Sequence, residues 1–95
     1  MLNSSVFKAI AHPVRRDILK RLRAGPQTAG DLAQHYAMSK PSLSAHFAVL
    51  KDADLVFTRR QGNFIFYNLN LTVADEILST VMDLFGIEEG SRHDP

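Results

Sequence analysis

The stretch from Thr28 to Leu50, TAGDLAQHYAMSKPSLSAHFAVL, decides the fold. At helical spacing it holds two short amphipathic segments, joined by a turn too tight for anything except two helices packed together. The first segment places Leu32, Ala33 and Tyr36 on one face. Thr28 is a favourable N-cap, and Asp31 three residues later completes a pair that resembles a capping box.

The second segment begins at Ser39, whose hydroxyl can accept from the free amides of the first helical turn. Pro41 fits there because an early position needs no backbone donor. Leu43, Phe47 and Leu50 recur at four and three residues, which predicts one buried stripe. We therefore expect a helix with a well-defined inner face.

The outer side of this second helix indicates its function. Its side chains are small or hydrogen-bonding, with one positive charge: Ser39, Lys40, Ser42, Ser44, Ala45 and His46. An ordinary solvated helix surface usually has more pairs of opposite charge. A helix that enters the major groove of DNA needs donors and acceptors, little bulk and no carboxylates facing phosphates. The pattern predicts a helix-turn-helix whose second helix is the recognition helix.

Charge is unevenly distributed along the chain. The net charge is only +1, but residues 1–70 hold ten of the eleven Lys and Arg against four acids, a balance of +6. Residues 71–95 hold one Arg against six acids, a balance of −5. The cationic part coincides with the predicted recognition helix, which favours a nucleic-acid partner.

Length and composition set the domain organisation. Ninety-five residues, 45% of them hydrophobic, suffice for one modest core. We predict one domain over residues 1–87 and a disordered acidic tail over residues 88–95. The chain has no cysteine, so neither disulfides nor thiolate metal sites can form. Without a signal peptide or a long apolar run, we expect a soluble cytoplasmic protein with no membrane insertion.

Two helices are predicted before the central stretch. Residues 3–10 start with capping-type residues and place Val6, Phe7 and Ile10 on one side of a short helix. His12-Pro13 breaks this helix, and Pro13 can begin the next one. The apolar stripe of that second helix consists of Val14, Ile18, Leu19 and Leu22, and Gly25-Pro26 ends it.

A hairpin is predicted after the recognition helix. We expect Asp54, in the turn after this helix, to adopt a left-handed backbone conformation, which glycine would occupy more easily. LVFTRR and FIFYNL are rich in β-branched and aromatic residues and are separated by Gln61-Gly62-Asn63. We assign Ile65, Tyr67 and Leu69 to the core side. Arg59, Arg60 and Asn63 then lie near the tip, where they can reach a phosphate or the minor groove.

The last predicted helix opens at Thr72, with Asp75 as its capping partner and Gly86 as a candidate C-cap. Apolar residues cover more than half of its circumference, which leaves more apolar surface than one small domain can bury. Either the helix is central to the core or it pairs with a copy of itself. We favour a symmetric dimer built by the first and last helices, through Val6, Phe7, Ile10, Val73, Ile77, Leu78, Val81, Met82 and Phe85.

The order of these elements and three motifs resemble the ArsR/SmtB family of winged-helix repressors. The motifs are VFKAIAHPVRRDILKRL at 6–22, TAGDLAQHYAMSKPSLSAHFAVLKDADLV at 28–56 and RRQGNFIFYNL at 59–69. The resemblance implies a mainly α fold with a β-hairpin wing, a winged helix-turn-helix of order α-α-α-α-β-β-α. It also implies a homodimer that binds an inverted-repeat operator and represses transcription, most like the small, cysteine-free autorepressors.

The DNA-contacting residues predicted from the pattern and the resemblance are Ser39, Lys40, Ser42, Ser44, Ala45, His46, Lys51, Arg59, Arg60, Gln61 and Asn63. The chain departs from the family pattern at four places. Thr28 and Gly30 stand where the thiolate sensor has cysteines, and the last helix offers carboxylates but no histidine. Ala45 replaces the usual Arg before His46, and Asp54 replaces the usual Gly. We predict no metal site and no cofactor.

Several alternatives stay open at this stage. His46 could pack beside Leu50 instead of approaching bases, and Arg15 or Arg16 could lie near a phosphate. Ser42 and His46 are four residues apart, but no third catalytic member or Gly-rich elbow accompanies them, so we predict no enzymatic activity. The chain could also be a winged-helix module that binds a protein through its last helix, or a metal-responsive repressor using histidines and carboxylates. No inducer or sequestering protein can be named.

Overall fold

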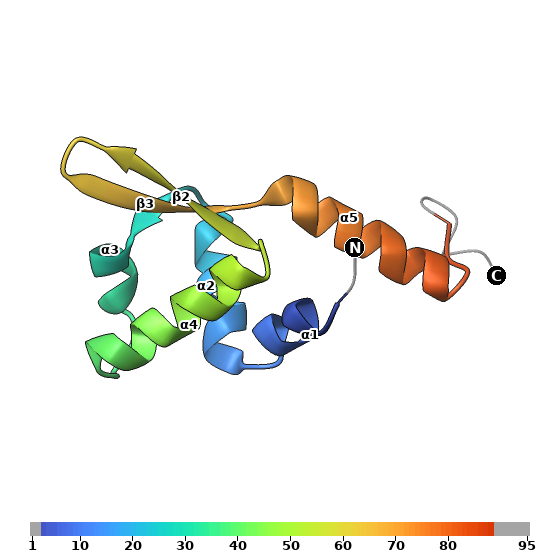
Figure 1. Ribbon diagram of the computed structural model, residues 1–95, viewed down its shortest axis with the longest axis horizontal. Helices are drawn as coiled ribbons and strands as arrows, with labels where there is room; N and C mark the ends of the chain where they lie inside the picture. Colours follow the sequence, from blue (N-terminus) through green and yellow to red (C-terminus); the bar gives the residue numbers. More distant parts are fainter. Residues whose placement is uncertain (1–2, 89–95) are drawn as a thin grey trace.

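A computed structural model describes residues 3–88 of the chain (Figure 1). Its elements are α1 (Ser4–Ile10), α2 (Pro13–Leu22), β1 (Gln27–Thr28), α3 (Ala29–Ala33), α4 (Lys40–Asp52), β2 (Val56–Gln61), β3 (Phe64–Leu69) and α5 (Leu71–Leu84). This is the predicted winged helix-turn-helix with one strand that the sequence analysis missed. The tail proposed for residues 88–95 lies outside the described residues except for Glu88.

The missed strand, β1, makes a three-stranded antiparallel sheet of order β1-β3-β2. Gln27 pairs with Tyr67, and Thr28 pairs with Phe66. A strand of two residues is too short to show period-two alternation. Its pairing with a strand some forty residues away depends on the tertiary fold, so no local pattern could reveal it.

The predicted helix boundaries around Pro13 are confirmed. Asn3 caps α1 by accepting from the amide of Val6 at 3.2 Å. Pro13 opens α2, and the N-cap His12 accepts from the amide of Val14 through Nδ1 at 3.1 Å. Gly25, at φ +142°, follows the end of α2, as the Gly25-Pro26 pair predicted.

The helix-turn-helix forms the centre of the core. Leu32 from α3 and Leu43, Phe47 and Leu50 from α4 are buried against Ile18 of α2. Both predicted caps are present, because Thr28 accepts from the amide of Asp31 at 3.1 Å and Ser39 accepts from that of Ser42 at 3.2 Å. These side chains satisfy amides that the first helical turn leaves unpaired. The recognition helix is thus fixed by its inner stripe and its cap.

The hairpin of β2 and β3 extends beyond this core. Its register pairs Val56 with Leu69 and Gln61 with Phe64 across the turn. Tyr67 packs on Phe47, with 4.7 Å between ring centroids, and Leu69 also packs against the core. Ile65, which we had assigned to the core side, is 52% exposed. Ile65 lies on the same face of the sheet as Tyr67 and Leu69, but this part of the hairpin extends beyond the core.

The last helix, α5, begins earlier than predicted. Asn70, not Thr72, is its N-cap and accepts from the amide of Val73 at 3.2 Å. At the other end Gly86 has φ +69°, and the amide of Ile87 donates to the carbonyl of Met82 at 2.8 Å. This pattern is a Schellman motif, so the predicted glycine cap is confirmed.

The placement of α5 excludes one of the two roles considered for it. No residue of α5 is buried, although Val73 and Ile77 pack at the edge of the core. In Figure 1 the helix extends away from the other elements, which gives the chain extents of 50 × 25 × 23 Å. It is therefore not central to the core of this chain. Within residues 3–88, no helix combines the length and apolar character needed to cross a membrane.

Asp54 confirms the predicted left-handed turn, with φ +60°. The amide of Asp54 donates to the carbonyl of Lys51 at 2.9 Å, and that of Leu55 donates to the carbonyl of Leu50 at 3.1 Å. These bonds form a Schellman motif at the end of α4, in which glycine is the usual residue.

Asp54→Gly is therefore expected to raise the free energy of unfolding by about 0.5–1 kcal/mol, because glycine has no Cβ penalty in this conformation. Urea unfolding followed by circular dichroism would measure the change. The control is Ala48→Gly, at an exposed position inside α4, which should destabilise by about 1 kcal/mol. Equal effects of the two substitutions would contradict the argument.

A polar cluster joins α2 to the residues after α3. The Tyr36 hydroxyl donates to Asp17 Oδ2 at 2.6 Å, and Arg21 Nε donates to the same oxygen at 2.8 Å. Burial, and then the bond to Asp17, raise the pKa of Tyr36 to about 12. The hydrogen bond from Tyr36, followed by that from Arg21, lowers the pKa of Asp17. The folded state thus favours neutral Tyr36 and ionised Asp17.

Tyr36→Phe is expected to lower the free energy of unfolding by about 1 kcal/mol at pH 7, below the full value for a charged acceptor because Asp17 is partly exposed. The lowered pKa of Asp17 means that its contribution is present above about pH 3.8 and is lost as pH falls. The raised pKa of Tyr36 means that its contribution is present below pH 10 and is lost as pH rises towards 12. Urea unfolding at several pH values would test both signs. Tyr67→Phe is the control, since no hydrogen bond of its hydroxyl is found within residues 3–88.

Candidate nucleic-acid interface

The outer face of α4 is open along its length. Ser39, Lys40, Ser42, Ser44, Ala45 and Lys51 are all exposed, as are Pro41 and Ala48. Asp52, the last residue, is the one carboxylate of the helix. The predicted set therefore lies on the surface, except for His46, which is half-buried. Ser39 and Ser42 also bond to each other, with 2.9 Å between their hydroxyl oxygens.

Neighbouring elements flank α4 on both sides. Lys40 and Ser44 line a hollow with Ala29, Gly30 and Ala33 of α3. Ser44 also lines a second hollow with Ala48, Lys51 and Tyr67 of β3. Ser44 therefore lies between the α3 side and the hairpin side. Ala45 is exposed and, at about 100° per residue, lies roughly opposite the buried stripe of Leu43, Phe47 and Leu50, so it is near the middle of the open face.

His46 lies on the side of α4 that faces α2. Its Nδ1 is 3.0 Å from Nη1 of Arg15, and its ring centroid is 4.5 Å from that of His12. Burial, then the charges of His12 and Arg15, lower the pKa of His46, which favours its neutral form. The packing histidine considered from the sequence is thus present, although its partners are Arg15 and His12.

Residues at the tip of the hairpin are exposed: Arg59, Arg60, Gln61 and Asn63. The register separates the two arginines, because Arg60 pairs with Ile65 and Arg59 pairs with Phe66. Side chains alternate between faces along a strand, so Arg60 shares the face of Tyr67, which packs on α4. Arg59 lies on the other face, with its guanidinium 5.5 Å from the ring centroid of Phe57. Arg60 Nε donates to the carbonyl of Gly62 at 3.1 Å.

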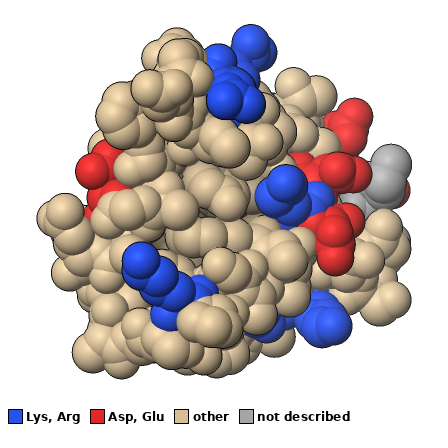
Figure 2. Space-filling model, turned by 60° about the vertical axis from the view of Figure 1, so that its left-hand side comes forward, with Lys and Arg blue, Asp and Glu red and all other residues tan. Residues whose placement is uncertain are grey.

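The hairpin tip and the start of α4 lie towards the same end of the molecule, and α5 lies at the other end (Figure 1). Figure 2 turns the first of these ends forward and shows separate Lys and Arg side chains on a mostly uncharged surface, with Asp and Glu side chains at the left edge and on the right side of the view. The cationic groups are spaced rather than clustered. Such spacing suits contacts to several phosphates along a duplex, with uncharged groups between them.

The residues predicted for dimerisation divide into three groups. Phe7, Ile10, Leu78 and Phe85 are exposed, at 55%, 38%, 57% and 73%. Val73, Ile77, Val81 and Met82 are half-buried within the chain. Val6 is only 3% exposed and belongs to the core, which corrects its assignment to a surface. It lies on the inner side of α1 because the helix packs on α2 and α4 through Val6 and Ala9.

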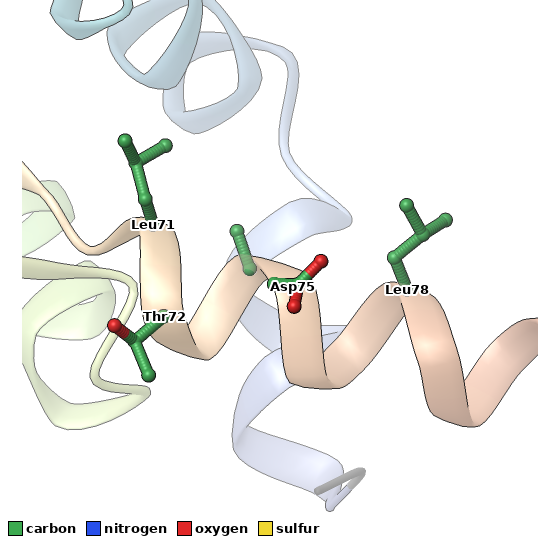
Figure 3. Close-up of a pocket in the computed structure, with 5 residues that line it drawn as sticks. Leu71, Thr72, Asp75 and Leu78 are labelled. Atoms are coloured by element: carbon green, nitrogen blue, oxygen red, sulfur yellow. The ribbon is translucent and has the colours of Figure 1, made fainter.

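The exposed apolar surface also includes residues that were not in the predicted dimer set: Leu71, Leu84 and Ile87, at 70%, 68% and 41%. Leu71 and Leu78 point to the same side of α5, with Asp75 between them (Figure 3). Phe85 continues this seven-residue spacing. The spacing was available in the sequence, but the earlier start of α5 was needed to place Leu71 on the helix.

Among residues 3–88, no three side chains of His, Cys, Asp or Glu come close enough to hold one ion. His12 and His46 are neighbours, but Nδ1 of each has a partner: Val14 for His12 and Arg15 for His46.

Comparisons with known proteins agree with this geometry. A family described as a helix-turn-helix domain matches residues 10–59. The transcriptional repressor SdpR of Bacillus subtilis is 45% identical over 80 residues, which cover 84% of this chain and 89% of SdpR. The arsenical resistance operon repressor of Staphylococcus aureus is 37% identical, covering 82% of this chain and 75% of that protein. The chain belongs to the ArsR/SmtB family.

Solved structures extend this agreement to the fold. An ArsR-like transcriptional regulator from Rhodococcus sp. RHA1 superposes with a TM-score of 0.77 at 26% identity, over 87% of this chain and 77% of that one. The structure of a possible transcriptional regulator for arsenical resistance gives 0.71 at 35% identity, over 90% and 88%. As a member of the ArsR/SmtB family, the chain is a DNA-binding transcriptional repressor and not an enzyme.

Proposed function

We propose that this ArsR/SmtB member represses transcription as a homodimer on an inverted-repeat operator. One α4 per subunit enters the major groove, and the hairpin contacts the adjacent backbone. The observation that carries the proposal is the open face of α4, where hydroxyls, small side chains and two lysines are exposed and no carboxylate occurs before Asp52. Such a surface can approach base edges without repelling phosphates.

The positions of the other surfaces support the dimeric part of the proposal. The hairpin tip lies at the same end as the start of α4, while exposed apolar residues of α5 gather at the other end. Two copies joined through α1 and α5 would leave both recognition helices free. For a symmetric dimer on one face of a duplex, the half-sites lie about one helical turn apart, roughly 34 Å.

Selection of bound duplexes from a random-sequence library would test the proposal. We expect an inverted repeat whose half-sites are separated by about one turn of DNA. If three or four groups per subunit meet phosphates, the logarithm of affinity should fall with that of salt concentration at a slope of about −5 to −7. Equal affinity for the selected duplex and for a scrambled one would refute sequence-specific repression.

The register of the hairpin predicts different roles in DNA binding for its two arginines. We propose that Arg60, on the face shared with Tyr67, meets a phosphate, whereas Arg59 does not. Arg60→Ala should weaken binding about three- to tenfold on all sequences and reduce the salt slope by about two per dimer. Arg59→Ala removes the same charge from the other face and serves as the matched control. Fluorescence anisotropy at several salt concentrations measures both, and a larger effect of Arg59→Ala would overturn the assignment.

A further inference from the structure

Arg15 is surrounded by acceptors from two different parts of the fold. Its Nε donates to the carbonyl of Ala9 at 2.9 Å, and its Nη2 donates to that of Lys8 at 2.7 Å. Both carbonyls belong to the last turn of α1, where carbonyls lack full helical partners, although that of Lys8 also accepts from the amide of Ala11 at 3.4 Å. The third nitrogen, Nη1, is 3.0 Å from Nδ1 of His46 on α4. All three guanidinium nitrogens therefore have partners within the chain.

The contact with Arg15 determines which ring nitrogen of His46 carries the proton. A guanidinium is always protonated and can only donate. Nδ1 of His46 must therefore accept, which places the proton of the neutral imidazole on Nε2. The ring of His12, itself fixed as the N-cap of α2, packs against His46 and limits its rotation.

We propose that Arg15 is a positioning residue that locks the recognition helix α4 to the end of α1 through His46, and that it makes no phosphate contact. This inference rests on the proposed operator binding. Because α1 carries the exposed Phe7 and Ile10 of the proposed dimer surface, the lock fixes the recognition helix relative to that surface. It thereby sets the separation and tilt of the two recognition helices on the operator.

The neighbouring arginines show why Arg15 is singled out. Arg16 is exposed, its Nη1 donates to the carbonyl of Ile10 at 2.8 Å, and no hydrogen bond from it to α4 is found within residues 3–88. Arg23 is exposed at the end of α2, and no side-chain hydrogen bond of it is found within residues 3–88. Both add positive charge to the same helix without joining it to α4, so Arg23 provides a matched control.

The test is to measure operator affinity and its salt dependence for Arg15→Lys, Arg15→Gln, His46→Phe and the double variant Arg15→Lys/His46→Phe, on the duplex selected by the wild type. Lysine keeps the charge but cannot reach three acceptors in fixed directions. Phenylalanine keeps the ring but has no acceptor. Each single variant should weaken binding about tenfold, and the double variant little more, because both remove one shared contact. The salt slope should stay at the wild-type value.

Two further variants complete the experiment: one that should restore the contact with Arg15, and one that serves as a control. His46→Asn places a side-chain oxygen near the position of Nδ1 and should recover most of the affinity. Arg23→Lys should bind as the wild type does. Nitrogen-15 chemical shifts should show Nδ1 of His46 without a proton at pH 7 in the wild type and a mixture of tautomers in Arg15→Lys. Thermal unfolding identifies any variant that fails to fold, in which case His46→Phe and His46→Asn alone decide the comparison.

Three outcomes would overturn the positioning role. Wild-type affinity in Arg15→Lys would show that charge alone suffices, and a salt slope that flattens in Arg15→Gln would identify a phosphate contact. Additive effects in the double variant would mean that Arg15 and His46 act separately. Failure of the wild type to select any operator would instead refute the proposed function, so the two failures are distinguishable.

Discussion

Leu78→Glu is expected to convert the proposed dimer to monomer and to weaken operator binding by about 100-fold or more. Leu78 is 57% exposed in the single chain and shares a seven-residue stripe of α5 with Leu71 and Phe85. In a symmetric dimer each substitution would place a carboxylate against the apolar surface of the partner, where an unpaired charge is costly. Loss of the dimer also removes the linkage between two half-site contacts, which accounts for the size of the effect on DNA binding.

Light scattering combined with size-exclusion chromatography would measure the oligomeric state. Ser79→Glu is the matched control, because it adds the same charge at the next, exposed position of α5, towards the polar side that includes Glu76 and Asp83. We expect this variant to remain dimeric and to bind DNA. A wild-type monomer with free α5 would favour the protein-binding module considered from the sequence, and a Leu78→Glu variant that stays dimeric would relocate the interface.

The second large effect is expected at the middle of the recognition surface. Ala45→Glu should weaken operator binding by about 100-fold, because it directs a carboxylate from the open face of α4 towards the phosphates and base edges. Ala45→Arg at the same position should strengthen binding and steepen the salt slope by about two per dimer. Opposite signs at one exposed site would show that this face meets the duplex.

Anisotropy titrations of the two Ala45 variants against selected and scrambled duplexes would measure both affinity and specificity. Glutamate and arginine are both good helix formers, so neither should change folding by much, and circular dichroism would confirm this. Ser79→Glu again controls for the added negative charge, since it lies on α5. If Ala45→Glu bound the operator as tightly as the wild type, α4 would not present this face to DNA.

Helix boundaries and inner faces illustrate what local sequence can predict. Thr28, Ser39 and Pro13 act within one helical turn of themselves, so each start was readable from a few residues. The buried stripe of Leu43, Phe47 and Leu50 followed from helical periodicity alone. The left-handed turn at Asp54 was also predicted, because the preceding helix had to end before the strand could start.

The sequence predictions differ from the structure where contacts between distant residues outweigh local sequence signals. Thr72 and Asp75 form a plausible capping pair, yet Asn70 caps α5 because its amide donates to the carbonyl of Leu55 at 2.9 Å and fixes the chain two residues earlier. Val6 matched a dimer stripe by spacing, but α1 uses it to pack inward. Ile65 had the parity of a core residue and lies beyond the edge of the core.

The sequence by itself determined the helix-turn-helix, the hairpin and the small, weakly charged outer face of α4, because caps, turns and side-chain periodicity act over a few residues. Only the tertiary structure decided that Arg15 meets His46, 31 positions away in the chain, and that Arg59 and Arg60 face opposite ways relative to α4. It also decided that α5 lies at the edge of the core, which it touches through Val73 and Ile77. These relations depend on how separate elements pack. The free energy of that packing is shared among distant residues, so no single stretch of sequence contains it.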